Sequence, residues 1–419
     1  MPTDTPLPEL EPSDTTLDAL VDDPDAFARL LTSIRRHLHR NPEVGMQEHA
    51  TSQFIRQTLE RYGLDVHGPV AETGLYVDIE GSEPGRGVAY RADIDALPTQ
   101  DSKQVPYRSR NAGVAHLCGH DAHTAIGIGV ALTLHHRRDA LPGRVRVFFQ
   151  PNEEGLPSGA PLMIRDGVLD GMSAAYAVHV DPSLGVGRFG MMTGAITAAS
   201  DRFDVRVRCE GSGHSARPHE SADTVWVANQ IMSALYQLAG RVTDARNATV
   251  ITICRLRGSE AHNVIPDEVT FGGTLRTTSP EDRDFVRKKM AQVAEQTANI
   301  YGASAFLDVQ KGAPPVLNAP AVVENVETIV RKQFGDHAVY EIPQASMGGE
   351  DFAYYLEHVP GALIRVGTAS SPETGYPLHD DRFDIDETPL ASTARLMADA
   401  LQRHLELDLS DDDIAGGTG

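Results

Sequence analysis

The chain has 419 residues and three cysteines, and its 59 acidic and 37 basic residues give a formal net charge of −22. This length is sufficient for two or three domains with sizeable cores, and so few, widely spaced cysteines exclude a disulfide-framed secreted module. The strong negative charge argues against binding to a nucleic-acid backbone or an anionic membrane surface. The longest apolar run, 125–134, is too short to span a bilayer, and the first residues lack the pattern of a signal peptide. We therefore expect a cytoplasmic protein without nucleic-acid or membrane partners.

The two ends of the chain differ in composition from the rest. Residues 1–22 are rich in Pro, Thr, Asp and Glu, and we expect a disordered acidic arm there, with a similar disordered tail over 408–419. Asp23 and Pro24 then supply the residue types that favour a helix start. The apolar residues that follow recur with helical spacing and predict the first helix of the core: Phe27, Leu30, Leu31, Ile34 and Leu38.

Strands and helices alternate over most of the chain. Apolar and alternating runs predict strands at 75–79, 88–90, 144–150, 174–180 and 362–366, and helices at 121–136, 160–165, 320–334 and 386–405. Such alternation is typical of an α/β domain with a mixed, largely parallel sheet flanked by helices. We expect this discontinuous domain to occupy residues 23–196 and 312–407.

A different order of elements separates the two parts of that domain. The pattern is strand, helix, strand, strand, helix, strand, which is the order of a ferredoxin-like α+β unit. The six expected elements span 203–209, 223–240, 249–256, 269–275, 280–301 and 304–309. Residues 197–311 are therefore predicted to form an inserted second domain.

Side chains able to bind metals lie where predicted strands end and helices begin. Cys118 and His120 precede the helix at 121–136, and a thiolate and an imidazole two residues apart are able to share a metal ion. Adjacent carboxylates, Glu153 and Glu154, follow a predicted strand. The residues alone leave other interpretations open, namely a buried cysteine beside a structural histidine and a solvated acidic turn.

Two further histidines occupy comparable positions. His179 closes the apolar strand at 174–180, and His379 begins an acidic segment that extends to Glu387. Open α/β sheets place their ligands at the carboxyl ends of strands. A core histidine and an acidic helix start are the alternative explanations for these two segments.

Polar loops in and after the inserted domain add candidate ligand contacts. The segments 211–219, 262–268 and 346–352 are each explained as turns when taken singly, because glycine-rich loops need no function. Gly348 and Gly349 carry no side chain that would prevent a ligand from approaching their backbone amides.

Taken together and in this order, these segments resemble the metallopeptidase family of aminoacylases and glutamate carboxypeptidases. They are most similar to its amidohydrolase branch of hippurate, N-acyl-amino-acid and auxin-conjugate hydrolases. The resemblance rests on residues 36–43, 91–98, 116–123, 149–154, 179–180, 213–214, 262–267, 273–276, 349–352 and 379–383. Ten segments in register are far more specific than any one of them.

The resemblance implies a set of metal ligands and a general base. The ligands fall on Cys118, His120, Glu154, His179 and His379. The general base falls on Glu153, and Asp95 is implied to orient a ligand. Other branches of the family carry a metal-binding histidine at the position of Asp93.

Residues of the inserted domain and of the loop after it are implied to contact the substrate. His214 is implied to stabilise the oxyanion of the tetrahedral intermediate. Arg276, Gly348 and Gly349 are implied to hold a free α-carboxylate, and Asn263 is implied to be a further substrate contact.

The resemblance also implies the reaction, the cofactors and the assembly. We expect a metal-dependent amidohydrolase that cleaves the amide bond of N-acyl amino acids with two divalent ions per subunit, which are Mn, Zn, Co or Ni. The inserted domain matches the family's lid and dimerisation domain, which implies a homodimer or higher homo-oligomer. The alternatives are a dipeptidase or aminobenzoyl-glutamate hydrolase on the same fold, and a catalytically inactive binding protein.

Overall fold

The computed structural model describes residues 16–83 and 85–407. The chain divides into two compact units. The first unit contains the described residues up to Gly194, then Leu317–Pro343 and the residues from Tyr354 onward, and the second contains Ala195–Val316 and Gln344–Ala353. Most of the expected arm and the whole expected tail, at 1–15 and 408–419, lie outside the described residues.

The end of the expected N-terminal arm is helical, so the prediction of disorder over 1–22 is wrong for its last residues. Helix α1 spans Leu17–Asp22, and the side chain of Thr16 caps it by accepting a hydrogen bond from the backbone N–H of Ala19. Leu20 and Val21 of this helix are buried in the core of the first unit. Two apolar residues in an acidic segment show no period, which is why the sequence pattern gave no sign of them.

A mixed sheet forms the centre of the first unit. Over the described residues its strands lie in the order β1-β2-β4-β3-β5-β16-β6-β15. These strands are β1 (Val66–Val70), β2 (Gly74–Glu80), β3 (Gly87–Asp93), β4 (Arg144–Gln150), β5 (Met172–Gly185), β6 (Phe189–Met191), β15 (Val339–Glu341) and β16 (Gly361–Ala369). The central strands β4, β3, β5 and β16 are parallel to their neighbours in this group. Every residue of β3 is buried, as expected for a parallel strand covered on both faces.

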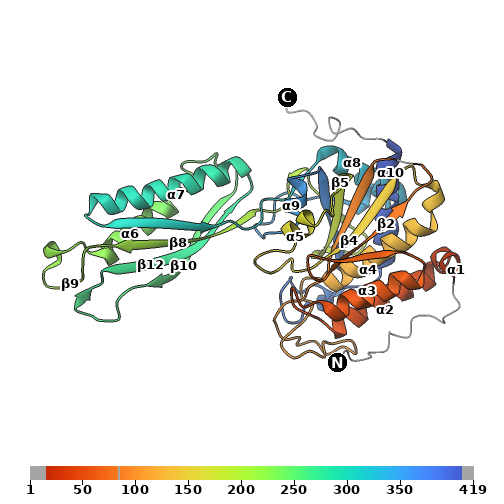
Figure 1. Cartoon of the computed structure of the whole chain (residues 1–419), viewed down its shortest axis with the longest axis horizontal. Coiled ribbons are helices and arrows are strands. Elements are labelled where there is room, and N and C mark those ends of the chain that lie inside the picture. The colour runs from red at the N-terminus through yellow and green to blue at the C-terminus, as the bar shows by residue number, and fades with distance from the viewer. Residues whose placement is uncertain (1–15, 84, 408–419) are drawn as a thin grey trace. The chain divides into compact units, whose positions relative to one another are not determined.

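Long helices pack together on one face of this sheet (Figure 1). They are α2 (Pro24–Arg40), α3 (His49–Arg61), α4 (His120–His136), α8 (Pro320–Phe334) and α10 (Pro389–Leu407). Helix α4 contacts α2, α10 and strands β3 and β4, and its residues from His120 to Leu134 are all buried. Short helices complete the unit at α5 (Ala160–Arg165) and α9 (Ala353–Leu356). The predicted α/β fold is therefore confirmed.

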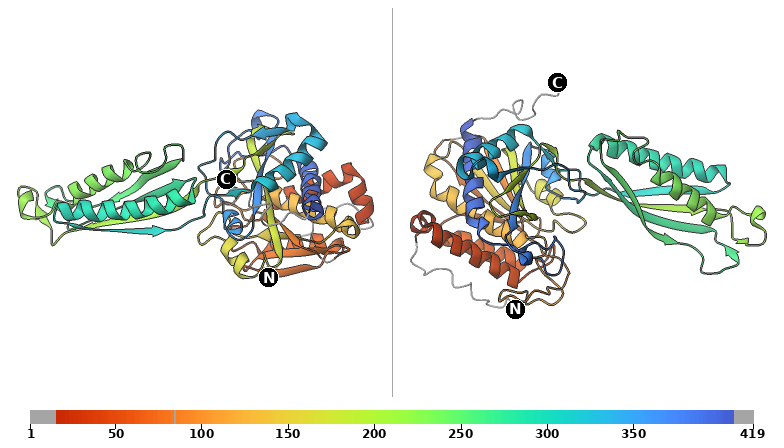
Figure 2. Two further views of the ribbon diagram at one scale, coloured as in Figure 1. Left: turned by 90° about the horizontal axis from the view of Figure 1, so that it is seen from above. Right: turned by 180° about the vertical axis from the view of Figure 1, so that it is seen from behind.

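The second unit has the predicted ferredoxin-like order of elements. These are β8 (Ala199–Arg208), α6 (Thr224–Tyr236), β10 (Thr249–Arg257), β12 (Glu268–Thr277), α7 (Pro280–Ile300) and β13 (Ser304–Gln310). The strands form an antiparallel sheet in the order β10-β12-β8-β13, and α6 and α7 pack on one of its faces (Figure 2). Alternate residues of β8, including Phe203, Val205 and Val207, are buried beneath these helices.

Four two-residue strands complete the described strands, namely β7 (Gly194–Ala195), β9 (Gly213–His214), β11 (Val264–Ile265) and β14 (Leu317–Asn318). Strand β9 pairs with β11 inside the second unit. Among the described helices, none is long and apolar enough to cross a membrane.

The register of the parallel strands explains where the candidate site lies. Asp93 pairs with Gln150, while Arg91 pairs with Ala177, so the last residue of β3 is level with the end of β4 and with His179 on β5. Parallel strands bring their carboxyl ends to one edge of the sheet. Helix α4 begins at His120 and packs on β3, β4 and β5.

Candidate active site

Cys118 and His120 lie at the start of α4, and Gly119 between them permits this position. Gly119 has a φ of +90°, in the left-handed region that favours glycine. A Cβ added there would come within 2.2 Å of the Cγ2 atom of Val180 on β5. Any other residue would therefore push the loop away from β5, which carries His179.

The two buried histidines present the same ring nitrogen to this site. Nδ1 of His120 lies 2.9 Å from the carbonyl oxygen of Asp95 and 3.1 Å from its carboxylate, so it carries the proton. Nδ1 of His179 donates to the carbonyl oxygen of Val180 at 2.8 Å. The Nε2 atom of His179 is then left with a lone pair. Burial disfavours the charged form of His120, but Asp93, Asp95 and Cys118 outweigh this effect and raise the pKa of His120 well above its ordinary value. Nε2 of His179 lies 3.5 Å from Sγ of Cys118, and Nε2 of His120 has no hydrogen-bond partner among the residues described.

The two glutamates follow β4 through an unusual turn. Asn152 has a φ of +52°, a conformation that asparagine tolerates better than most residues, and its side-chain amide donates to the carbonyl oxygen of Pro157 at 2.7 Å. The peptide bond between Glu153 and Glu154 is fixed as well, because the backbone N–H of Glu154 donates to the carboxylate of Asp95 at 3.1 Å. An Oε2 atom of Glu153 lies 4.0 Å from Nε2 of His120.

All five predicted metal ligands lie together. The donor atoms of Cys118, His120 and His179 are within 4.8 Å of one another, as are those of Cys118, Glu154 and His379. Cys118 belongs to both groups, and His379 Nε2 lies 3.1 Å from Glu154 Oε1. Two cation positions sharing one thiolate fit this arrangement, because sulfur, imidazole and carboxylate are the donors that zinc and similar ions prefer.

Burial keeps two of the predicted metal ligands, Cys118 and His179, in their neutral forms. Burial raises the pKa of the Cys118 thiol to about 12, and the charge of Glu154 adds to this effect. A thiol with this pKa is protonated near neutral pH, and a divalent ion is the kind of partner that deprotonates it. Burial, together with Arg365, holds the pKa of His179 well below its ordinary value, so this ring is in the neutral form that binds metals.

Asp93 and His123 support this site, although neither was assigned a role from the sequence. Asp93 accepts a hydrogen bond from Arg91 at 2.7 Å and lies 2.7 Å from Nδ1 of His123. Nε2 of His123 accepts the backbone N–H of Val180, next to the predicted ligand His179, at 2.9 Å. Both ring nitrogens of His123 are therefore engaged. Its position three residues after His120 on one helix face is the sequence signal that was available.

In the second unit, Arg276 on β12 lies beside Gly349. A Cβ added at Gly349 would be 3.5 Å from Nη1 of Arg276. Within the described part of the chain, no carboxylate forms an ion pair with the Arg276 guanidinium. The backbone N–H of Gly348 donates to the hydroxyl of Ser346 at 3.1 Å, so this amide is already satisfied within its own turn. Of the two amides, we therefore retain that of Gly349 as the candidate anion contact beside Arg276.

His214 and Asn263 are neighbours in the same unit. His214 pairs with Val264 across β9 and β11, and the backbone N–H of Ser215 donates to the carbonyl oxygen of Asn263 at 3.1 Å. The N–H of Ala216 donates to Nδ1 of His214 at 3.0 Å. A neutral His214 ring consequently carries its proton on Nε2, which is the donor that an oxyanion requires.

Comparison with known proteins defines the class of protein, which is an amide-bond hydrolase. Residues 89–403 match the family described as Peptidase family M20/M25/M40. The chain belongs to this family, as the sequence motifs predicted.

Individual relatives agree with this assignment. An N-acetyl-L-cysteine deacetylase of Bacillus subtilis is 36% identical over 378 residues, which cover 90% of this chain and 88% of the relative. The IAA-amino acid hydrolase ILR1-like 2 of Arabidopsis thaliana is 33% identical over 390 residues, covering 92% and 88%. The crystal structure of the Bacillus subtilis YXEP protein, a dinuclear metal binding peptidase, superimposes on this chain with a TM-score of 0.81. The two sequences are 34% identical, and the match covers 91% of this chain and 99% of the YXEP chain.

Proposed function

We propose that this protein hydrolyses the amide bond of N-acyl amino acids and releases a carboxylic acid and an amino acid. One observation carries the proposal: donor atoms of Cys118, His120, Glu154, His179 and His379 converge in two groups around one thiol, with a carboxylate of Glu153 beside them. Support for the substrate class comes from the relatives, whose names specify an N-acetylated amino acid and an indole-acetic acid–amino acid conjugate.

The five donors are proposed to hold two divalent ions of Mn, Zn, Co or Ni. Cys118, His120 and His179 would hold one ion, and Cys118, Glu154 and His379 would hold the other. Such a pair, when bound, polarises an amide carbonyl and makes water a stronger nucleophile at neutral pH. Asp95 and His123 orient these ligands through the contacts described above.

Glu153 is proposed to transfer the proton. Its carboxylate lies 4.0 Å from His120, at the edge of the donor cluster, and is not itself needed to complete either group of three ligands. It would accept a proton from the attacking water and deliver that proton to the nitrogen of the leaving amine. This assignment requires one carboxylate that alternates between its charged and neutral forms during each turnover.

The second unit is proposed to contact the substrate. His214 would donate its Nε2–H to the oxyanion of the tetrahedral intermediate, a kind of contact whose loss typically lowers turnover by about 10²–10³-fold. Arg276 and the amide of Gly349 would bind the free α-carboxylate of the amino-acid half. Asn263, beside His214, is proposed as a further substrate contact.

A panel of substrates tests the proposed reaction. The metal-loaded protein is incubated with N-acetyl, benzoyl and indole-acetyl amino acids, with free dipeptides and with aminobenzoyl-glutamate, and both products are quantified. We expect equimolar amine and carboxylate from the N-acyl amino acids, and loss of this activity on chelation. Preference for dipeptides or for aminobenzoyl-glutamate would replace the proposal with those activities. No hydrolysis by fully metal-loaded protein would indicate a binding protein.

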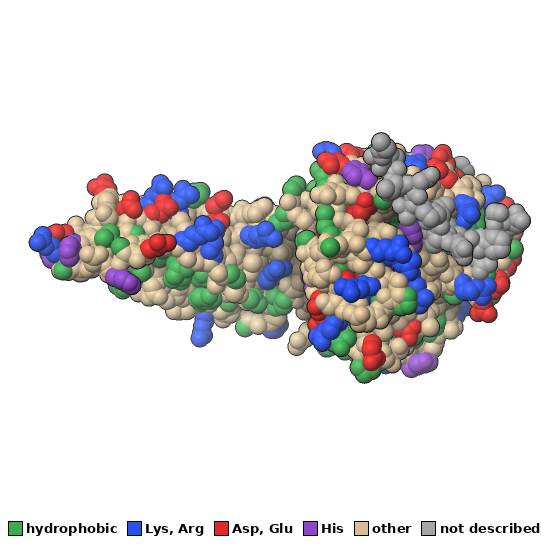
Figure 3. Space-filling view, turned by 90° about the horizontal axis from the view of Figure 1, so that it is seen from below, with side chains coloured by type: hydrophobic (Ala, Val, Ile, Leu, Met, Phe, Trp, Pro, Cys, Tyr) green, Lys and Arg blue, Asp and Glu red, His purple; other side chains and the backbone are tan. Residues whose placement is uncertain are grey.

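We also propose that the protein forms a homodimer or a higher homo-oligomer through its second unit. Apolar side chains gather on the face of this unit shown in Figure 3. Val250 and Leu256 of the edge strand β10 are 41% and 59% exposed. Exposed apolar residues in such a group are typical of an interface. Light scattering after size-exclusion chromatography would report a mass of at least twice 45.3 kDa.

A further inference from the structure

Arg35 on α2 is a fully buried guanidinium that connects two distant segments of the first unit. Its Nε atom donates to the carboxylate of Asp121 at 2.8 Å. Its Nη2 atom donates to Asp384 at 2.7 Å, and its Nη1 atom donates to Glu387 at 3.2 Å. One side chain therefore joins the first turn of α4 to the segment 384–387.

Each of these segments lies close in sequence to a proposed metal ligand. Asp121 immediately follows His120, and Asp384 lies five residues after His379. The backbone N–H of His379 donates to the carbonyl oxygen of Leu117, next to Cys118, at 2.7 Å. The loop that carries His379 is thus attached to the start of α4 at two points, once through the backbone and once through Arg35.

His379 needs such attachment more than the other proposed ligands do. Its side chain is 51% exposed, whereas those of Cys118, His120 and His179 are buried, so packing does little to fix it. Its φ is +69°, which a residue with a side chain adopts only at an energetic cost. Strained backbone of this kind persists where the surrounding contacts enforce it.

The contacts of Arg35 are strong enough to provide this restraint. Burial disfavours the charged guanidinium, but Asp121, Asp384 and Glu387 outweigh that effect and raise the pKa of Arg35. Removing one partner of a buried ion pair is commonly destabilising. Two of the acids keep other partners, since Asp121 lies 2.7 Å from Nδ1 of His39 and Asp384 accepts the hydroxyl of Tyr107 at 2.8 Å. The loss of Arg35 therefore loosens the connection, while Asp121 and Asp384 each keep a hydrogen-bond partner.

We propose that Arg35 is a positioning residue for the metal site, which holds the His379 loop against the start of α4 and so sets the affinity for the ion bound by Cys118, Glu154 and His379. The proposal rests on the ligand set of the proposed function. The ion held by Cys118, His120 and His179 depends on buried rings that are fixed by Asp95 and Val180, and it does not require Arg35.

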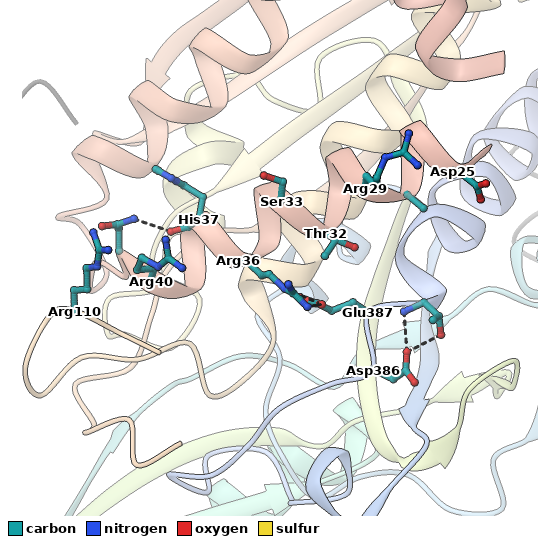
Figure 4. A pocket seen from close by; sticks show the side chains of 13 residues that line it. Asp25, Arg29, Thr32, Ser33, Arg36, His37, Arg40, Arg110, Asp386 and Glu387 are labelled. Atoms are coloured by element: carbon teal, nitrogen blue, oxygen red, sulfur yellow. Dashed lines mark hydrogen bonds and ion pairs between the residues drawn. The ribbon is translucent and has the colours of Figure 1, made fainter. Parts of the chain in front are cut away.

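Arg36 provides a matched control because it binds one of the same carboxylates from the solvent side. Its Nη2 atom donates to Glu387 at 2.6 Å, and its side chain is 49% exposed. Figure 4 shows Arg36 and Glu387 side by side on the wall of a surface pocket of about 970 Å³. A solvent-exposed pair of this kind contributes little to stability, so its removal changes the surroundings of the same carboxylate without breaking the buried connection.

The test compares Arg35→Met, Arg35→Lys, Asp384→Asn and Arg36→Met with the natural chain. Metal-free protein is titrated with Mn²⁺ or Zn²⁺ by calorimetry, and thermal unfolding of the metal-free form is measured separately. We expect two binding events for the natural chain and for Arg36→Met. In Arg35→Met and Asp384→Asn we expect the first event to be unchanged and the second to weaken by about 10–100-fold, with Arg35→Lys intermediate.

The outcomes separate this proposal from the proposed function. If the natural chain binds two ions and both Arg35→Met and Asp384→Asn bind them equally tightly, the positioning role is wrong, whatever the effect on thermal unfolding. Equal weakening of both binding events would also contradict it, because that result indicates a general loss of structure. If the natural chain itself binds fewer than two ions, the proposed ligand set fails, and the Arg35 proposal fails with it. Asp384→Asn keeps the test decisive should the Arg35 variants fail to fold.

Discussion

The carboxylate of Asp95 contacts His120 and Glu154 at once, and so links a residue of each proposed cation position. One oxygen lies 3.1 Å from Nδ1 of His120, and the other accepts the backbone N–H of Glu154 at 3.1 Å. Asp95 is 1% exposed, so water does not replace either contact. The Asp95 side chain therefore orients the His120 ring and also fixes the backbone at Glu154.

Replacing Asp95 is expected to weaken metal binding. Asp95→Ala should lower the affinity for at least one ion by about 10–100-fold, because residues that hydrogen-bond metal ligands have effects of this size. Calorimetric titration of the metal-free protein measures the change. Asp139→Ala, at a side chain that is 98% exposed, is the control and should bind metal like the natural chain. Unchanged affinity in Asp95→Ala would show that His120 needs no such orientation.

Glu153 and Glu154 are expected to fail in different ways when each is made neutral. Glu153→Gln should retain both ions and lose about 10²–10⁴-fold in kcat, since it removes only the group that carries the proton. Glu154→Gln should lose metal. Elemental analysis of the purified variants, together with kcat on an N-acyl amino acid, separates the two effects. A Glu153→Gln enzyme with near-normal turnover would remove Glu153 from its proposed role.

Arg276 is expected to determine the requirement for a free carboxylate. Arg276→Ala should raise KM for N-acyl amino acids by at least about tenfold, because a charge-assisted contact contributes roughly 1.5–3 kcal/mol. Neutral amides of the same acyl groups should change much less. Arg206→Ala, an exposed arginine on the neighbouring strand β8, is the control. Equal changes for both kinds of substrate would contradict the assignment.

A buried histidine outside the site predicts how stability depends on pH. Nδ1 of His404 on α10 lies 2.8 Å from the hydroxyl of Tyr176, and burial, with a smaller effect of Arg86, lowers the pKa of His404 to about 4. In the unfolded chain His404 gains a proton as the pH falls through about 6.5, whereas in the folded chain it stays neutral until about pH 4. The stability contributed by neutral His404 is therefore complete above pH 6.5 and is lost as the pH falls towards 4, by up to about 3 kcal/mol.

Chemical denaturation at pH 7.5, 6 and 5 checks this prediction. The natural chain should lose more free energy of unfolding over this range than His404→Gln, which keeps a neutral hydrogen-bonding side chain. Other histidines contribute equally to both proteins, so the difference between the two curves isolates His404. Parallel curves would mean that His404 does not titrate abnormally.

The fold could be predicted from the sequence because its signals are local. Periods of two and 3.6 residues identified the strands and helices of both units, and ligand-type residues at the ends of strands drew attention to Cys118, His120 and Glu154. Only the family resemblance joined these segments to His179 and His379, because distance along the chain says nothing about proximity in space.

The supporting residues could not be found in this way. Arg35 and Asp121 are 86 positions apart, and Arg35 and Asp384 are 349 positions apart, yet they share hydrogen bonds in the core. The role of Asp93 becomes clear only from its contacts with Arg91 and His123. Buried polar networks depend on tertiary packing, which leaves no period in the sequence.

Anomalous X-ray diffraction from crystals of the metal-loaded protein tests the central claim most directly. We predict two anomalous peaks about 3.5–4 Å apart, the usual separation in two-metal hydrolytic sites. Cys118 Sγ should lie between them, with His120 and His179 on one ion and Glu154 and His379 on the other, and no bond to Glu153 should be required. A single peak, or two peaks bound by other side chains, would contradict the proposed site.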